Sequence, residues 1–288
     1  MPFRLNKGNT LLDSTSKGGQ DKLLHLCRHK EKANIVMLKS YSDESRREKS
    51  PFLTVAGYVM TESQFTALND GWRTALDGLP YFHMREGHHI THPKIYAALL
   101  ELIASEHMIA GFHTALHEPY YEQLTNPKFQ GQTLRYWFGG AYSFCLSAYM
   151  RLVGDWLAEN MPEEKCVAYF FDAGDARAGE ADMFAKMVAS NKRFETQKSA
   201  YRYASHTWLD GKGAIGRVLQ SSDILAWHFS YFLTHGKMLP EGKQITRAVK
   251  VFYQHYLDPK TISLTIHKTL DLELELVEEK ARTNREKR

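Results

Sequence analysis

The sequence contains few cysteines, and none of them lies in a recognisable pair. Cys27, Cys145 and Cys166 are the only three among 288 residues, and no CxxC motif occurs. This usage favours a reduced, cytoplasmic setting in which the thiols are buried and structural. The N-terminus lacks the apolar segment of a signal peptide, and no apolar run approaches the roughly 20 residues that a membrane helix needs. We therefore expect no membrane partner.

Several familiar catalytic signatures are also missing. The chain has no P-loop, no GxSxG motif, no HExxH motif and no Cys/His arrangement typical of a nucleophile. Any catalytic chemistry must therefore come from other side chains. The acidic residues are the first candidates, because several of them follow apolar segments.

The composition is that of a folded, mildly basic protein. Hydrophobic residues make up 43% and charged residues 24%, which argues against extensive disorder. The length favours one elaborated domain over two. Lysine and arginine number 37 against 33 aspartates and glutamates, and this balance permits an anionic partner without requiring one.

Strand-like and helix-like patterns alternate along the middle of the chain. We expect a flexible or partly helical arm over residues 1–33, a domain over 34–270 and a charged C-terminal segment over 271–288. The expected strands are 34–41, 52–60, 108–116, 166–175 and 201–209. Helices are expected after the capping box of Thr61 and Gln64, from Pro93, and over 133–160, 179–190, 216–233 and 243–257. Interleaved strands and helices indicate an α/β fold with a central sheet flanked by helices.

Three acid-bearing stretches share one pattern, because each places its acids at the end of a strand or inside an apolar helix. Asp43 and Glu44 follow the first strand, and Asp172 ends the fourth strand. Such strand ends are where α/β proteins build sites. Because adjacent strand residues point to opposite faces, Asp43 and Glu44 cannot both face one site unless the strand has ended before them.

Asp223 is the most informative of the acids. It lies in an expected helix that is apolar around most of its circumference, where an aspartate is costly unless it is paired or bound to a metal. Gln220 lies one turn earlier on the same face. A carboxylate with a nearby amide partner is therefore expected to face the sheet.

Clustered carboxylates repel one another, so a cation would be needed to compensate their charge. Oxygen ligands favour Mg²⁺ or Mn²⁺, and such ions can activate a water for attack on a phosphodiester. Each acid also has an ordinary interpretation. Asp43 and Glu44 could form a turn, Asp172 could belong to a turn and helix cap, and Asp223 could pair with Arg217 or Lys212.

A loop between two expected helices is rich in polar chemistry. It holds Glu86 and four histidines, His83, His88, His89 and His92. Three interpretations of this loop remain open: a zinc site, a contribution of Glu86 or His83 to the carboxylate cluster, and a solvated loop without a role.

The motifs "YSDES" and "QSSD" resemble those of the domain-of-unknown-function family 3800, over about residues 34–235. Asp43 and Glu44 match the DE pair of that family, and Gln220 and Asp223 match its QxxD motif; Arg46 stands where glycine is common. The resemblance implies an RNase H-like mixed central sheet flanked by helices, and a predicted nuclease associated with phage defence or mobile elements. It also implies a catalytic role for Asp172, and roles for His83 and Glu86 in "FHMREG".

The first hypothesis is therefore a metal-dependent nuclease acting on DNA or RNA. Asp43, Glu86, Asp172 and Asp223 would hold Mg²⁺ or Mn²⁺, with Glu44 as a substitute for Glu86. Gln220 and His83 would orient ligands or water, and Lys212 and Arg217 would contact phosphates. The alternative is a non-catalytic RNase H-like module that binds nucleic acid or a partner protein, for example in a defence complex. A homodimer buried through the aromatic helices is a further expectation.

Overall fold

The computed structural model describes residues 38–45, 50–105, 108–125, 139–173, 199–248, 252–260 and 262. The expected arm over 1–33, the C-terminal segment over 271–288 and the expected helix over 179–190 all lie outside these residues. The domain boundaries therefore stay predictions.

The described chain forms a mixed six-stranded sheet in the order β5-β4-β1-β2-β3-β6. β2 runs antiparallel to β1 and β3, whereas the pairs β1–β4, β4–β5 and β3–β6 are parallel. The α/β fold with a mixed central sheet flanked by helices is thus confirmed. The strands are β1 (Leu38–Ser45), β2 (Phe52–Met60), β3 (Ala110–His117), β4 (Val167–Asp172), β5 (Tyr203–Leu209) and β6 (Phe252–Leu257).

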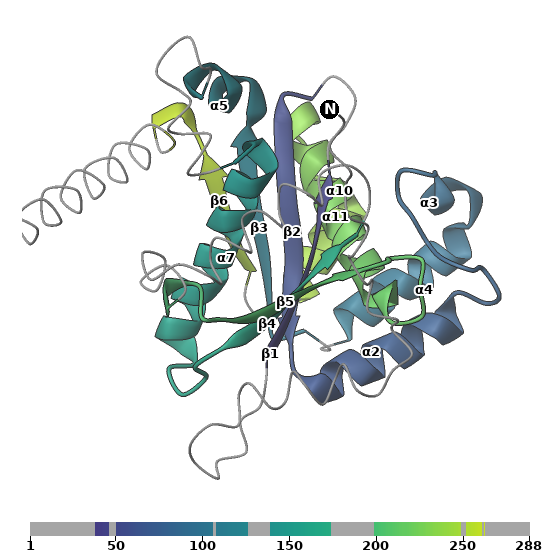
Figure 1. The fold of residues 1–288 in the computed structure, drawn as a ribbon. Coiled ribbons are helices and arrows are strands. Elements are labelled where there is room, and N and C mark those ends of the chain that lie inside the picture. Colours follow the sequence, from purple (N-terminus) through teal and green to yellow (C-terminus); the bar gives the residue numbers. More distant parts are fainter. Residues whose placement is uncertain are drawn as a thin grey trace, which may run out of the picture.

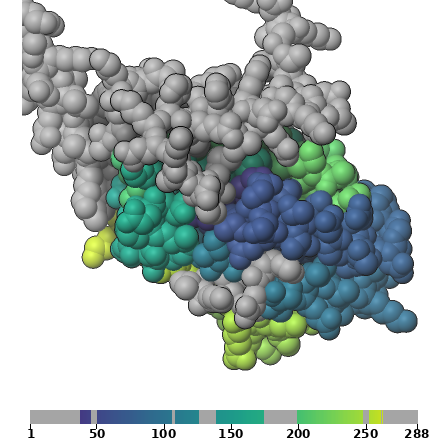
Figure 2. All heavy atoms as spheres, turned by 90° about the horizontal axis from the view of Figure 1, so that it is seen from below, coloured from purple at the N-terminus to yellow at the C-terminus, as the bar shows by residue number. Residues whose placement is uncertain are grey.

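Helices cover the sheet on both faces (Figure 1). One face carries α7, whose side chains join those of β2, β3 and β4 in one apolar cluster. The other face carries α10, α2 and α4, which share a second cluster with the sheet. In the view from below (Figure 2), the blue surface of the segment with α2 and α4 lies beside the teal surface of α7. The described helices are α2 (Glu62–Ala75), α3 (His88–Thr91), α4 (Pro93–Ala104), α5 (Glu118–Leu124), α7 (Ala141–Asn160), η3 (Gly216–Val218), α10 (Leu219–His235) and α11 (Pro240–Ala248).

Local sequence signals explain where several of these elements begin. The Thr61 side chain accepts the Gln64 amide hydrogen, and the Gln64 side chain accepts from the Thr61 amide, which confirms the capping box of α2. Pro93 stands in the first turn of α4 as expected. Cys145 is buried in α7. Among the helices described, none is long and apolar enough to cross a membrane.

Two expectations about element boundaries were wrong. The helix expected over 243–257 ends at Ala248, and β6 follows from Phe252. The reason is tertiary packing, because successive side chains of this segment pack on opposite faces of the sheet. Phe252 stacks on Phe229 on one face of the sheet at 5.1 Å, whereas Tyr253 stacks on Phe112 on the other face at 5.7 Å between ring centroids.

The first strand was also expected to end at Tyr41, before its acids, and instead it runs through them to Ser45. Antiparallel pairing with β2 continues to Ser45 opposite Thr54, whereas the parallel pairing with β4 reaches only Ser42 opposite Phe171. β1 therefore extends beyond β4. The side chains of Asp43 and Glu44 alternate between the two faces of the sheet.

Candidate functional site: an acidic pocket at the edge of the sheet

A pocket of about 460 Å³ lies at the carboxyl ends of β1 and β4. The chain proceeds from β1 to β2 and β3 on one side of the sheet, and β4 and β5 lie on the other side. This reversal between β1 and β4 is where open α/β sheets form binding crevices. The lining includes every site residue expected from the sequence except Glu44 and Arg217: Asp43, His83, Glu86, Asp172, Lys212, Gln220 and Asp223.

Three aspartates reach the pocket from three elements. The β1–β4 register pairs Ser42 with Phe171, so Asp43 and Asp172 stand next to each other at the following position and on the same face. Asp223 comes from α10, which is tied to β1 by a hydrogen bond from Ser222 Oγ to the Tyr41 carbonyl oxygen at 2.9 Å. The sheet register and one helix contact thus bring the expected acids together.

Each of the three carboxylates accepts a hydrogen bond from a backbone N–H. Asp43 Oδ1 accepts from the Glu44 amide at 2.8 Å, and Asp172 Oδ1 accepts from the Gly211 amide at 3.0 Å. Asp223 Oδ2 accepts from the Met84 amide at 2.8 Å. These bonds hold the carboxylates in place by contacts to the main chain. The alternative in which Asp223 pairs with Arg217 or Lys212 receives no support from these contacts.

The electrostatics of the pocket disfavour three ionised aspartates. Burial, followed by the charges of Glu44, Asp223 and Asp172, raises the pKa of Asp43 well above its usual range. Burial also raises the pKa of Asp223, and the Asp172 charge adds to this effect, although His83 and the Met84 amide act against it. Such a pocket favours a bound proton or cation over bare negative charge.

Gln220 connects the segments that surround the pocket. Its Oε1 accepts hydrogen bonds from the Trp72 indole N–H and from the Phe82 amide, both at 2.9 Å. Its Nε2 donates to the Gly211 carbonyl oxygen at 2.7 Å. Because the Gly211 amide in turn donates to Asp172, Gln220 holds the loop that orients this aspartate. The QxxD pattern therefore supplies an organising amide and a carboxylate from one helix.

Glu86 and Lys212 meet at the rim of the pocket. Tyr81 OH donates to Glu86 Oε2 at 2.8 Å, and Lys212 Nζ lies 3.4 Å from Glu86 Oε1. The Tyr81 hydrogen bond, more than the Lys212 charge, lowers the pKa of Glu86. His83 lies beside Asp223, with its Nδ1 3.6 Å from Asp223 Oδ2, and this Nδ1 accepts the Arg85 amide hydrogen at 3.1 Å.

Two expected site residues lie elsewhere. Glu44 faces the α7 side of the sheet, where its charge, after burial, raises the pKa of Tyr142. The reason is the alternation of a strand that continues to Ser45. Arg217 belongs to η3 and does not line the pocket.

A Gly-x-Gly-x-x-Gly pattern over residues 211–216, between β5 and α10, was not among the features predicted from the sequence. In dinucleotide-binding folds such a loop binds phosphate through its backbone amides. Here the amides of Gly211, Lys212 and Gly213 donate to Asp172 Oδ1, Asp210 Oδ1 and the Asp210 carbonyl oxygen. The loop shapes the site, and its first amides are already engaged within the protein.

The donor chemistry of the pocket fits a hard divalent cation in part. Its acids offer oxygen ligands, which Mg²⁺ and Mn²⁺ prefer. Within the described ranges, however, no three His, Cys, Asp or Glu side chains are spaced closely enough to form a complete metal site, and this holds for the zinc interpretation of the histidine loop too. A magnesium ion that keeps several waters needs only one or two direct carboxylates, and the three aspartates can supply these.

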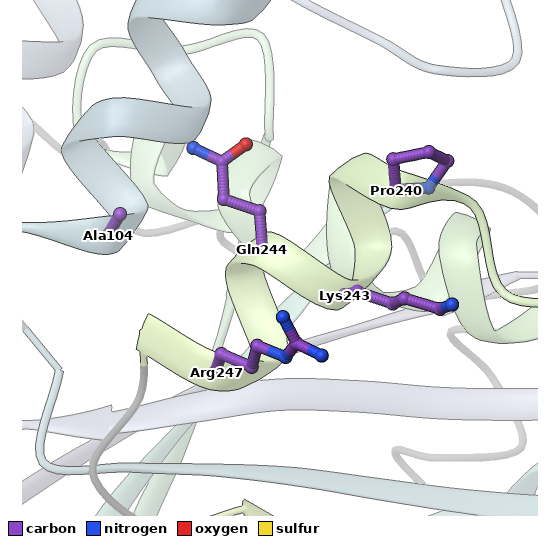
Figure 3. Close-up of a pocket in the computed structure, with 5 residues that line it drawn as sticks. All are labelled: Ala104, Pro240, Lys243, Gln244 and Arg247. Carbon is purple, nitrogen blue, oxygen red and sulfur yellow. The ribbon is translucent and has the colours of Figure 1, made fainter.

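A second, more open hollow of about 500 Å³ lies between the end of α4 and α11 (Figure 3). Ala104, Pro240, Lys243, Gln244 and Arg247 line it. It contains two cations and no carboxylate, so its chemistry is opposite to that of the acidic pocket. Its lining offers no carboxylate ligand for a cation.

Comparison with protein-family models gives no match for the chain, and comparison with curated proteins and with solved structures gives none either. The resemblance to family 3800 through the DE and QxxD motifs therefore stays a prediction. What the described structure establishes is an α/β domain with an acidic pocket at its sheet edge.

Proposed function

We propose that the protein is a metal-dependent nuclease with an RNase H-like fold, in agreement with the resemblance to family 3800. The sheet supports the fold, because the resemblance implies a mixed central sheet flanked by helices and the described residues form one, with β2 antiparallel to both its neighbours. The observation that carries the functional proposal is the meeting of Asp43, Asp172 and Asp223 in one pocket.

In this proposal the three aspartates hold Mg²⁺ or Mn²⁺. The bound ion would supply charge neutralisation at a phosphodiester and activation of water. Asp43 and Asp172 share the sheet edge, and Asp223 closes the pocket from α10. Gln220 positions Asp172 through Gly211, and His83 stands beside Asp223 as a polar neighbour of the reacting groups. Nucleic acid is the proposed partner, and a role in phage defence or mobile elements is proposed from the family resemblance alone.

A non-catalytic binding module is the second candidate. It is favoured by one observation, namely that the described side chains do not form a complete metal site. In that case the acids would shape a surface for nucleic acid or a protein without turnover.

A cleavage panel tests the proposal. The purified chain is incubated with single- and double-stranded DNA, with RNA and with a hybrid, each in Mg²⁺, Mn²⁺ or EDTA. We expect cleavage that requires metal and that disappears in the Asp172→Asn variant, because this change removes one ionised ligand while keeping the side-chain shape. Glu159→Gln, on α7 across the sheet, is the matched control.

The outcome separates the two candidates. Metal-dependent cleavage that survives Asp172→Asn would reject the assigned site. Binding of nucleic acid without cleavage in any metal, with affinity that is unchanged or higher in Asp172→Asn, would favour the binding module.

A further inference from the structure

Among its described lining residues, the acidic pocket contains one lysine or arginine side chain. This side chain is Lys212, and the same lining contains five carboxylates: Asp43, Glu86, Asp172, Asp210 and Asp223. A phosphate group that enters the pocket is repelled by these acids and attracted by Lys212. The position of this ammonium group therefore matters for any anionic substrate.

Lys212 is engaged at the rim by residues from the segment between α2 and α3. Its Nζ lies 3.4 Å from Glu86 Oε1, 3.4 Å from Tyr81 OH and 4.4 Å from the centre of the Tyr81 ring. Tyr81 OH also donates to Glu86 Oε2 at 2.8 Å. The three side chains form a closed group that joins the β5–α10 loop to the opposite wall.

Glu86 is oriented by this group. Lys212 lies at one of its oxygens, and the other accepts from Tyr81 and has His88 Nε2 at 3.6 Å. His88 Nδ1 accepts the His83 amide hydrogen at 3.1 Å, so its proton is on Nε2 and faces Glu86. The carboxylate expected as a fourth metal ligand therefore has another partner set.

We propose that Lys212 is the residue that binds a substrate phosphate, and that Glu86 and Tyr81 hold it in a resting position until a phosphate displaces Glu86. This inference rests on the proposed nuclease function, and it assigns Glu86 to control of the pocket mouth instead of metal binding. The backbone amide of Lys212 is fixed by Asp210 Oδ1 at 2.9 Å, so the side chain can move about a fixed anchor.

The exposure of the pair makes such an exchange feasible. The Lys212 side chain is 55% exposed and the Glu86 side chain 39%. Exposed ion pairs contribute little to stability because water screens them and both side chains lose freedom. A phosphodiester carries the same single negative charge and the same number of charged oxygens as the carboxylate that it replaces, so it can take over the contact with the ammonium group.

The test measures the reactivity of Lys212 directly, by acylation with an activated ester and mass spectrometry of the labelled peptides. We expect Glu86→Gln to increase the acylation rate of Lys212 by about two- to fivefold, in line with the loss of an exposed pair. Lys243 on α11 is the internal control, and Glu159→Gln is the matched control variant. Addition of short oligothymidylate in EDTA should slow the labelling of Lys212 and not that of Lys243.

Each outcome bears on the proposal separately from catalysis. Unchanged Lys212 reactivity in Glu86→Gln would overturn the resting contact. Absence of oligonucleotide protection in a chain that cleaves nucleic acid with metal would reject Lys212 as the phosphate site and leave the nuclease function standing. Protection without cleavage in any metal would support the phosphate site and reject the nuclease. Loss of metal binding in Glu86→Gln, measured by calorimetry with Mn²⁺, would return Glu86 to the metal site.

Discussion

Asp43 and Glu44 are neighbours on β1, yet the two faces of the sheet give them different surroundings. Asp43 joins Asp172 and Asp223 in a pocket that contains backbone donors and polar side chains. Glu44 faces the side covered by α7, near Tyr142. Strand alternation thus separates two adjacent acids that the sequence presents as one motif. The site forms on the face where a helix brings a further carboxylate.

The largest expected effect tests this difference directly. In the proposed nuclease, Asp43→Asn should lower metal-dependent turnover by at least about 10²-fold, because it removes an ionised ligand of the proposed metal site. Glu44→Gln makes the same chemical change one residue later and should cause a much smaller loss, because its side chain lies across the sheet. Steady-state cleavage rates at saturating Mg²⁺ measure both. Equal losses in the two variants would show that both acids serve one site.

Gln220 lies on the face of the sheet that carries the pocket. Replacing its side chain should mainly reduce the stability of the fold. Gln220→Ala leaves the Trp72 indole N–H and the Phe82 amide without their acceptor. An unsatisfied buried group costs about 1–3 kcal/mol, so the free energy of unfolding should fall by roughly 2–4 kcal/mol. Urea titration measures this fall.

Gln244 supplies the matched control for that prediction. It lies exposed on α11, so Gln244→Ala should change the free energy of unfolding by less than about 0.5 kcal/mol. A similar small change in Gln220→Ala would mean that water replaces the missing acceptor and that the amide is not an organising residue.

His113, on the same face of the sheet, should make the free energy of unfolding depend on pH. It is buried against Phe229 with a centroid distance of 4.0 Å, and neither ring nitrogen has a hydrogen-bond partner among the described residues. Burial lowers the pKa of His113 to about 3, below the value of about 6.5 in an unfolded chain. The unfolded state therefore binds more protons between these values, and stability is lost as the pH falls from about 6.5 towards 3.

The slope from this one imidazole should approach about 1.4 kcal/mol per pH unit. His113→Leu should therefore flatten the dependence of the free energy of unfolding on pH by about that amount, as measured by urea titrations from pH 4 to pH 8. Burial also lowers the pKa of His228, to about 4, so part of the slope should remain. If the variant kept the full wild-type slope of unfolding free energy against pH, other groups would be responsible for the pH dependence.

The sequence predicted the acids better than it predicted their arrangement. An aspartate in an apolar helix and acids after apolar strands are local signals, and they identified Asp43, Asp172 and Asp223. The end of β1 was wrong because the register of the pairing with β2, which extends the strand to Ser45, is not visible in the residue pattern of β1 itself. β6 was mistaken for helix because its alternating packing depends on helix α10 and strand β3, which lie far from it in the chain.

The contacts of Glu86 and Gly211 could not be derived from composition or spacing either. Glu86 was assigned to the metal site from its polar loop and from the resemblance to family 3800, whereas its partners are Tyr81 and Lys212, which lies in a loop after β5. The role of Gly211 required the knowledge that its amide meets Asp172. Both contacts form where separate segments of the chain meet, and the tertiary fold determines where these segments meet.

The smallest expected effect has the opposite sign, because the pocket acids cost stability. The raised pKa of Asp223 means that its contribution to folding is fully present below its unfolded pKa and is lost as the pH rises through the folded value. At pH 7 Asp223→Asn should therefore increase the free energy of unfolding by about 1 kcal/mol. For a domain of this size, that gain raises the melting temperature by a few degrees. Calorimetry in EDTA measures the gain. Saturating Mg²⁺ should remove it, because the ion stabilises only the ionised site. A lower melting temperature in EDTA would mean that the hydrogen bond to Met84 outweighs the repulsion among the acids.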